Sequence, residues 1–213
     1  MKKARYICLE GGEGVGKSTQ TEKLTSYLRE RGFSVLQTKE PGTPLSPLTM
    51  EMRGIMLDKQ YDEEMTVHAR EFISQAIRSV HIENIIRPAL ETHDFIIQDR
   101  GILSGLAYGT ACGNDESFLE RMSCMHDKYF YSLYDTVLYL QGDVSKGLDT
   151  ALSSKQEFAA GDAMEAKGLS FLNEVKQNMD YQSKRFNTSN INVDSKDIET
   201  VFSEMLTALD LPE

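Results

Sequence analysis

Short apolar segments alternate with longer stretches of helical periodicity along this chain of 213 residues. Five apolar runs predict buried strands, and they cover residues 6–9, 34–38, 95–97, 136–140 and 190–193. Segments compatible with helices separate them, the first running from Lys17 to Arg31 and ending at Gly32. Strands connected by helices of this length form parallel sheets. We therefore expect an α/β fold with a five-stranded parallel sheet covered by helices on both faces.

A long helical pattern lies between the second and third predicted strands, from about Glu63 to Glu91. Its apolar residues Phe72, Ala76 and Val80 recur at helical spacing, which predicts one buried face. Pro88 interrupts the pattern, and proline in a helix interior removes a hydrogen bond and clashes with the preceding turn. We expect the helix to bend or end there.

Composition narrows the class of protein. Hydrophobic residues make up 40% of the chain and charged residues 26%, as in an ordinary globular protein. Without a repeat or a linker, residues 1–213 are expected to form a single domain, and no apolar run approaches the ~20 residues that cross a membrane. The net charge of -10 opposes a sequence-independent grip on nucleic acid. We expect a cytoplasmic protein with small-molecule ligands, neither membrane-bound nor a nucleic-acid binder.

A glycine-rich segment directly follows the first predicted strand and opens the first helix. It fits the GxxxxGK[ST] pattern of the P-loop, which predicts a P-loop NTPase-type three-layer fold. The backbone N–H groups of such a loop surround phosphate oxygens, Lys17 adds a charge, and the Ser18 hydroxyl can ligate Mg²⁺. The expected ATP phosphate site is Gly11, Gly12, Glu13, Gly14, Val15, Gly16, Lys17, Ser18 and Thr19.

The P-loop alone does not separate kinases from other nucleotide-binding proteins. The chain lacks the NKxD and DxxG motifs of GTPases and is too short for the accessory domains of most motor ATPases. Asp99 and Arg100 follow the third predicted strand, where a carboxylate can orient Mg²⁺ and a guanidinium can project into the ligand crevice. The alternative for this pair is a surface ion pair at a strand end. Arg53 and Arg78 are further candidates for binding an acceptor nucleotide.

Four motifs in order make the sequence resemble the thymidylate kinase family of nucleoside monophosphate kinases. The P-loop contains an acid, Glu13, and the segment 39–43 (KEPGT) is similar to the family's REPGGT with one glycine missing. Arg78 lies ten residues before the PAL sequence at 88–90, and the segment 99–108 (DRGILSGLAY) matches the family's DRxxxSxxAY. The resemblance spans nearly the whole chain and implies transfer of the γ-phosphate of ATP to deoxythymidylate (dTMP), with Mg²⁺.

The resemblance also implies roles for individual residues. Arg78 would donate to O4 of thymine and reject cytosine, which offers an amino donor there. Tyr108 would lie against the sugar and select deoxyribose, although core packing explains it too. Arg53 and Arg100 would hold the monophosphate. The implied dTMP site is Glu13, Glu40, Pro41, Arg53, Ser74, Arg78, Arg100, Ser104, Gly105 and Tyr108. The implied catalytic residues are Lys17, Asp99, Arg100 and Lys155, and the implied metal ligands are Ser18 and Asp99.

The base site departs from the family at Ser74, where a phenylalanine usually stacks on the pyrimidine. Phe72 does not simply replace it, because two residues along a helix rotate a side chain by about 200°. Stacking of this kind is worth ~1–3 kcal/mol, so its loss broadens base recognition. A kinase for dUMP, or for a dUMP with a larger 5-substituent, is therefore an alternative.

The lid departs as well. Family members without an arginine in the P-loop usually carry arginines in the lid, but this chain has Val15 in the loop and Lys155 in the predicted lid at about 150–165. Either Lys155 is catalytic, or Mg²⁺ and Lys17 balance most of the charge. Residues 159–161 suit a closing lid and equally a plain flexible loop. The missing arginines leave a non-catalytic P-loop binding module as a further alternative. The resemblance also implies a homodimer through the long helices, although burial within the monomer accounts for their apolar face.

Overall fold

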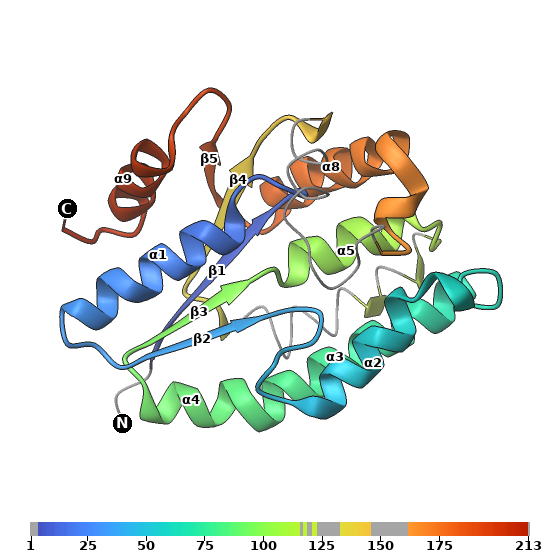
Figure 1. Ribbon diagram of the computed structural model, residues 1–213, viewed down its shortest axis with the longest axis horizontal. Coiled ribbons are helices and arrows are strands. Elements are labelled where there is room, and N and C mark those ends of the chain that lie inside the picture. Colours follow the sequence, from blue (N-terminus) through green and yellow to red (C-terminus); the bar gives the residue numbers. More distant parts are fainter. Residues whose placement is uncertain (1–3, 116, 119–120, 123–132, 146–161, 213) are drawn as a thin grey trace.

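The computed structural model describes residues 4–115, 117–118, 121–122, 133–145 and 162–212. A parallel sheet of five strands in the order β2-β3-β1-β4-β5 forms its centre (Figure 1). The strands are β1 (Arg5–Gly11), β2 (Val35–Lys39), β3 (Phe95–Asp99), β4 (Thr136–Gln141) and β5 (Ser189–Asn192). All pairings are parallel, which confirms the expected sheet.

Two helices cover one face of the sheet. Helix α1 (Lys17–Glu30) packs there beside α9 (Ile198–Ala208). Alternate residues of the central strand, Ile7 and Leu9, point toward them and are fully buried. Leu24, Leu28 and Met205 complete this half of the core.

The other face is covered by the remaining helices. Helix α5 (Ile102–Ala111) and helix α8 (Gly168–Arg185) pack against Cys8 and Tyr139. Helix α4 (Arg87–Thr92) packs beside Tyr6 and Ile96. Because α1 follows β1 on one face and α5 follows β3 on the other, the carboxyl ends of these neighbouring strands open a crevice between them.

The long predicted helix is interrupted. After α2 (Pro47–Leu57) and a short 3₁₀ turn (Lys59–Tyr61), helix α3 runs over Val67–His81, a π-helical segment follows over Ile82–Ile86, and α4 then continues to Thr92. The Thr66 hydroxyl caps α3 through the Ala69 N–H, which places the start after the predicted Glu63. The helical path does not end at Pro88. The irregularity precedes it, where the wider π turn accommodates the missing N–H.

A short 3₁₀ turn (Glu165–Lys167) precedes α8. Most of the predicted lid, including Lys155, lies outside the described residues. Among the helices of the described segments, none combines the length and the apolar character that a membrane crossing requires.

Candidate functional site

The P-loop joins β1 to α1 at the crevice. Gly16 occupies the N-cap position of α1 with φ 87, a left-handed backbone that favours glycine. Lys17 turns back over the loop, and its Nζ donates to the Gly12 carbonyl. The N–H groups at the start of α1 therefore face the crevice with a cation beside them, which is the arrangement that binds phosphate.

Lys17 is only 6% exposed. Burial, and after it the nearby charge of Arg100, lowers the pKa of its ammonium group from 10.5 to about 8. A phosphate group placed against this ammonium would favour the charged form. Lys17 is thus prepared to hold an anion.

Asp99 ends β3 directly beside the P-loop. The Ser18 hydroxyl donates to Asp99 Oδ2 at 2.6 Å, while Asp99 Oδ1 is buried without a hydrogen-bond partner among the described residues. The described segments contain no cluster of three or more His, Cys, Asp or Glu side chains that could hold a metal alone. A hydroxyl, a carboxylate with an unsatisfied oxygen and nucleotide phosphates are nevertheless the oxygen donors that Mg²⁺ takes at such loops. These residues fit the expected ion.

Arg100 lies at the centre of the crevice. Its φ of 65 is left-handed, a conformation that costs a non-glycine residue roughly 1–2 kcal/mol and is common at functional sites. The guanidinium donates to the Gly11 carbonyl at 2.9 Å, to the Ser104 hydroxyl at 3.2 Å and to Glu13 Oε1 at 2.6 Å. The same Glu13 oxygen accepts from the Tyr108 hydroxyl at 2.9 Å. Although burial opposes it, the Glu13 charge raises the pKa of Arg100.

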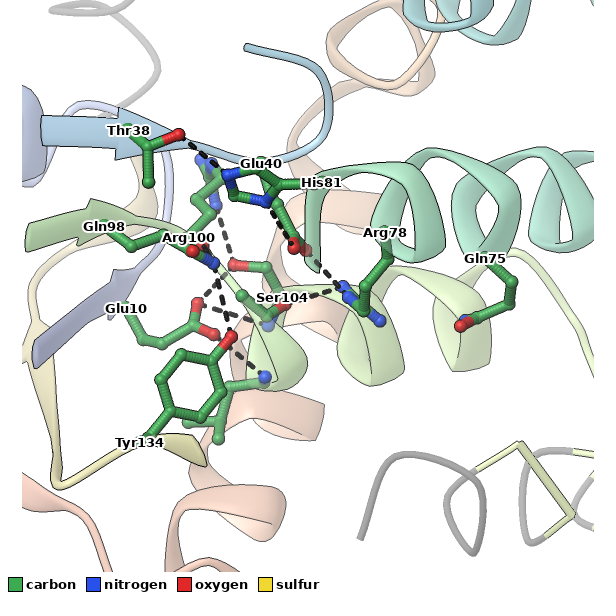
Figure 2. Close-up of polar contacts among 12 residues, drawn as sticks. Glu10, Thr38, Glu40, Gln75, Arg78, His81, Gln98, Arg100, Ser104 and Tyr134 are labelled. Atoms are coloured by element: carbon green, nitrogen blue, oxygen red, sulfur yellow. Dashed lines mark hydrogen bonds and ion pairs between the residues drawn. The ribbon is translucent and has the colours of Figure 1, made fainter. Parts of the chain in front are cut away.

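A buried carboxylate that the motifs did not indicate supports this centre. Glu10 accepts from the backbone N–H of Leu103 at 2.9 Å, and from the N–H and hydroxyl of Ser104 at 3.2 and 2.5 Å (Figure 2). It therefore caps the start of α5 and orients the hydroxyl that Arg100 contacts. Burial raises its pKa. The sequence contained one indication of this role, because Glu10 is an acidic residue inside an otherwise apolar strand.

A second buried network surrounds Arg78 on α3. Its Nε donates to Glu40 at 2.7 Å and its Nη2 to the Gly101 carbonyl at 3.1 Å. His81, one turn further, lies between Glu40 at 3.1 Å and Thr38 at 2.8 Å (Figure 2). Burial raises the pKa of Glu40, but the Arg78 charge and the His81 hydrogen bond outweigh it and bring the pKa to about 2.

Helix α5 makes room for Arg78 at Gly105. A Cβ atom at this position would lie 2.8 Å from Arg78 Nη2, closer than side chains tolerate. The glycine is therefore required by the arginine across the groove. Arg78 and Gly105 both line one cavity, which has a volume of about 540 Å³.

That cavity runs from the P-loop to the groove between α3 and α5. Arg53 lines it from α2, where its Nη1 donates to the Pro41 carbonyl at 3.0 Å. The other lining residues predicted for the two nucleotides are Glu13, Gly14, Gly16, Lys17, Ser18, Thr19, Glu40, Pro41, Ser74, Asp99, Arg100, Ser104 and Tyr108. Lys17 and the arginines Arg53, Arg78 and Arg100 thus line a single space. Arg53 and Arg100 do not point to separate faces of the molecule.

Comparison with known proteins agrees with this geometry. The family model described as thymidylate kinase matches residues 9–205. The chain belongs to the thymidylate kinase family. It is 32% identical to the thymidylate kinase of Geobacillus sp. (strain WCH70), over 97% of this chain and 96% of the relative. It is 34% identical to that of Synechococcus sp. (strain CC9605), over 81% of each chain. The crystal structure of the Ehrlichia chaffeensis thymidylate kinase has the same fold, with a TM-score of 0.69 at 22% identity over 98% of this chain and 100% of that one.

Family membership makes the chain a nucleotide-binding transferase that uses ATP as phosphate donor. Gly11, Gly12 and Val15 lie outside the cavity lining, but the carbonyl groups of the two glycines position Arg100 and Lys17. The Val15 side chain packs against the sheet core. Tyr108 lines the cavity and also packs against the core, and its expected contact with the sugar stays a prediction.

The cavity reaches the position where the sequence departs from the family pattern. Ser74 lines the cavity, whereas the Phe72 ring is 56% exposed and contacts Phe118 at 5.6 Å between ring centroids. Phe72 therefore does not replace the phenylalanine that the family has at the position of Ser74. Three further buried polar residues of this region belong to none of the sequence motifs, namely His81, Glu71 and Asn114. Nothing in the sequence around them indicated a functional role.

Proposed function

We propose that this thymidylate kinase transfers the γ-phosphoryl group of ATP to dTMP, forming ADP and dTDP. The single observation that carries the proposal is the continuous cavity, which the P-loop lines at one end and Arg53, Arg78 and Arg100 line at the other. Two anionic substrates brought into one enclosed space can react in line, without a covalent intermediate on the protein.

The donor phosphates would occupy the P-loop. Main-chain N–H groups at the start of α1 and the Lys17 ammonium would bind them, and Ser18 and Asp99 would hold Mg²⁺. When bound, this ion neutralises phosphate charge as the γ-phosphoryl group leaves. The sequence left two possibilities open: either Lys155 is catalytic, or Mg²⁺ and Lys17 balance most of the charge. The role of Lys155 stays a prediction, because this residue lies outside the described residues.

The acceptor phosphate would lie against Arg100 and Arg53. Arg100 is held in place by Gly11, Ser104 and Glu13, so its planar guanidinium is already oriented when the phosphate arrives. Glu13 would also accept a hydrogen bond from the 3′-hydroxyl of the sugar, and Tyr108 would leave no room for a 2′-hydroxyl. Both side chains line the cavity at this point.

Arg78 would select the base. Glu40 and the Gly101 carbonyl fix its guanidinium, and it presents only donors. Thymine and uracil offer the O4 acceptor. Cytosine instead offers an amino group, so two hydrogen-bond donors would face each other and binding would be disfavoured. Pro41, Ser74, Ser104 and Gly105 complete the pyrimidine site.

A lid over about 150–165 would close the cavity and exclude water, so that ATP is not hydrolysed. The proposal includes a single domain, a cytoplasmic location where both nucleotides are made, and a homodimer. Exposed apolar side chains on α2 and α3 support the dimer, namely Leu48, Ile55, Val67 and Phe72. Light scattering after size-exclusion chromatography tests it, and a monomer at micromolar concentration contradicts it.

A coupled assay of ADP release across deoxynucleoside monophosphates tests the activity. We expect turnover of Mg·ATP with dTMP and a much lower rate with dCMP or dGMP. Equal rates with dCMP or dGMP would contradict the role of Arg78. Absence of turnover with every monophosphate would contradict the proposal as a whole.

A further inference from the structure

The cavity extends beyond Arg78 along the groove between α3 and α5. Along α3, Ser74 and Glu71 lie one and two turns before Arg78 on the same face, and all three line the cavity. Along α5, the lining continues from Gly105 through Gly109 to Cys112. Serine fills far less of this space than the family's phenylalanine would. The groove therefore has room past the pyrimidine ring.

Two hydrogen-bond acceptors lie in this extension. Glu71 is 5% exposed, and its carboxyl group accepts one hydrogen bond among the described residues, at Oε1 from Gln75 Nε2 at 2.5 Å. Asn114 is 7% exposed, and its Nδ2 donates to the Gly109 carbonyl at 2.8 Å. Its Oδ1 is buried and has no partner among the described residues. Native proteins seldom leave buried acceptors unsatisfied, because each one costs about 1–3 kcal/mol.

Within the described part of the chain, the two arginines near Glu71 donate to other groups. Arg70, beside Glu71, directs its guanidinium to the Met56 carbonyl and to Asp62 at 2.7 Å. Arg78 donates to Glu40 and to the Gly101 carbonyl, and in the proposed function it also donates to O4 of the base. The end of the groove thus offers oxygen atoms to a donor that a ligand would bring.

Chemistry restricts where such a donor is attached. With O4 of a pyrimidine against Arg78, the adjacent C5 would lie beside the groove that Ser74 leaves open, and its substituent would extend into that groove. The methyl group of thymine has no donor, whereas a hydroxymethyl group carries one O–H. We propose that this enzyme also phosphorylates deoxyuridylates whose C5 substituent carries a hydrogen-bond donor, with Glu71 and Asn114 as specificity-determining residues. The inference rests on the proposed function and extends it.

The reaction is the same phosphoryl transfer as with dTMP. The bond between the γ-phosphorus and the β,γ-bridging oxygen breaks, and ADP leaves with the electron pair. A phosphate oxygen of the acceptor forms the new bond, giving the 5-substituted diphosphate. No oxidant or reductant takes part, and the C5 substituent is unchanged.

The test compares 5-hydroxymethyl-dUMP with dTMP as acceptor in the ADP-release assay. We expect kcat/KM for 5-hydroxymethyl-dUMP to equal or exceed that for dTMP. Ser74→Phe should lower the ratio of the two kcat/KM values by tenfold or more, because the ring fills the groove. Asn114→Ala removes an acceptor and should lower the ratio about tenfold. Glu71→Gln keeps an oxygen acceptor but removes its charge, and it should lower the ratio by a smaller factor.

Surface variants of the same helical stretch serve as matched controls. Ser79→Phe and Glu83→Gln alter exposed side chains and should leave the ratio unchanged. Circular dichroism identifies variants that fail to fold, and titration calorimetry of the wild-type enzyme with each monophosphate gives a second measure that needs no turnover.

The outcomes separate the two proposals. Turnover of dTMP with more than tenfold lower kcat/KM for 5-hydroxymethyl-dUMP overturns the inference and leaves the proposed function standing. The same holds if the ratio does not change in the folded Asn114, Glu71 and Ser74 variants. Loss of turnover and binding with both acceptors overturns both.

Discussion

The two ends of the cavity are built in different ways. At the phosphate end, the P-loop, Asp99 and Arg100 are attached to the carboxyl ends of β1 and β3, and their polar groups bond mostly to one another or to main chain. At the base end, side chains from α3 and α5 face each other across a groove, and acceptors on Glu71 and Asn114 are incompletely satisfied. The comparison indicates that phosphate binding is fixed by the sheet, whereas base selection depends on which side chains the helices present.

Removing the P-loop ammonium should have the largest effect. We expect Lys17→Ala to lower kcat with dTMP by about 10²–10³-fold, because a cation is lost where charge develops. The ADP-release assay measures it. Lys23→Ala is the matched control on the same helix, since Lys23 pairs with Glu199 at 2.8 Å on the surface. Equal losses in the two variants would contradict the role of Lys17.

At the point where the two ends meet, Arg100→Lys should lower kcat/KM for dTMP by about 10–100-fold. Lysine keeps the charge but not the planar guanidinium that bonds to Gly11, Ser104 and Glu13 together. Steady-state kinetics at saturating ATP measures the change. Activity within twofold of the wild type would mean that charge alone suffices there.

A smaller change should affect the base end alone. Gly105→Ala places a Cβ 2.8 Å from Arg78 Nη2, so we expect KM for dTMP to rise about tenfold and the preference over dCMP to fall, while KM for ATP stays the same. Gly54→Ala is the control, because a Cβ there meets nothing within 4 Å. An equal rise in both KM values would show that the two ends are not separable.

The phosphate end was largely predictable from sequence, and the base end was not. A short motif between a strand and a helix places Gly16, Lys17 and Ser18, because neighbours in sequence remain neighbours in space. The Asp99–Arg100 pair likewise follows from the end of a strand. Glu71 approaches the cavity from α3 and Asn114 from the loop after α5, and the interruption over Ile82–Ile86 precedes the residue that lacks an N–H, Pro88. Residues that are brought together from distant parts of the chain leave no pattern in any short stretch of sequence.

The smallest effect concerns pH. Because the folded pKa of Lys17 is about 8 against 10.5 for an exposed lysine, the unfolded chain holds more protons between these values, and stability contributed by this site rises with pH. From pH 7 to pH 9.5, urea unfolding of the wild type should gain about 2 kcal/mol relative to Lys17→Met. Lys23→Met should follow the wild type. Parallel pH dependence in Lys17→Met would contradict the lowered pKa.

The central claim is that phosphoryl transfer takes place between the two ends of one cavity. Following the radiolabelled γ-phosphorus of ATP in a single turnover with dTMP tests it most directly. The account predicts that the label appears in the terminal phosphate of dTDP, with little inorganic phosphate. Label released only as inorganic phosphate, at a rate independent of dTMP, would contradict it.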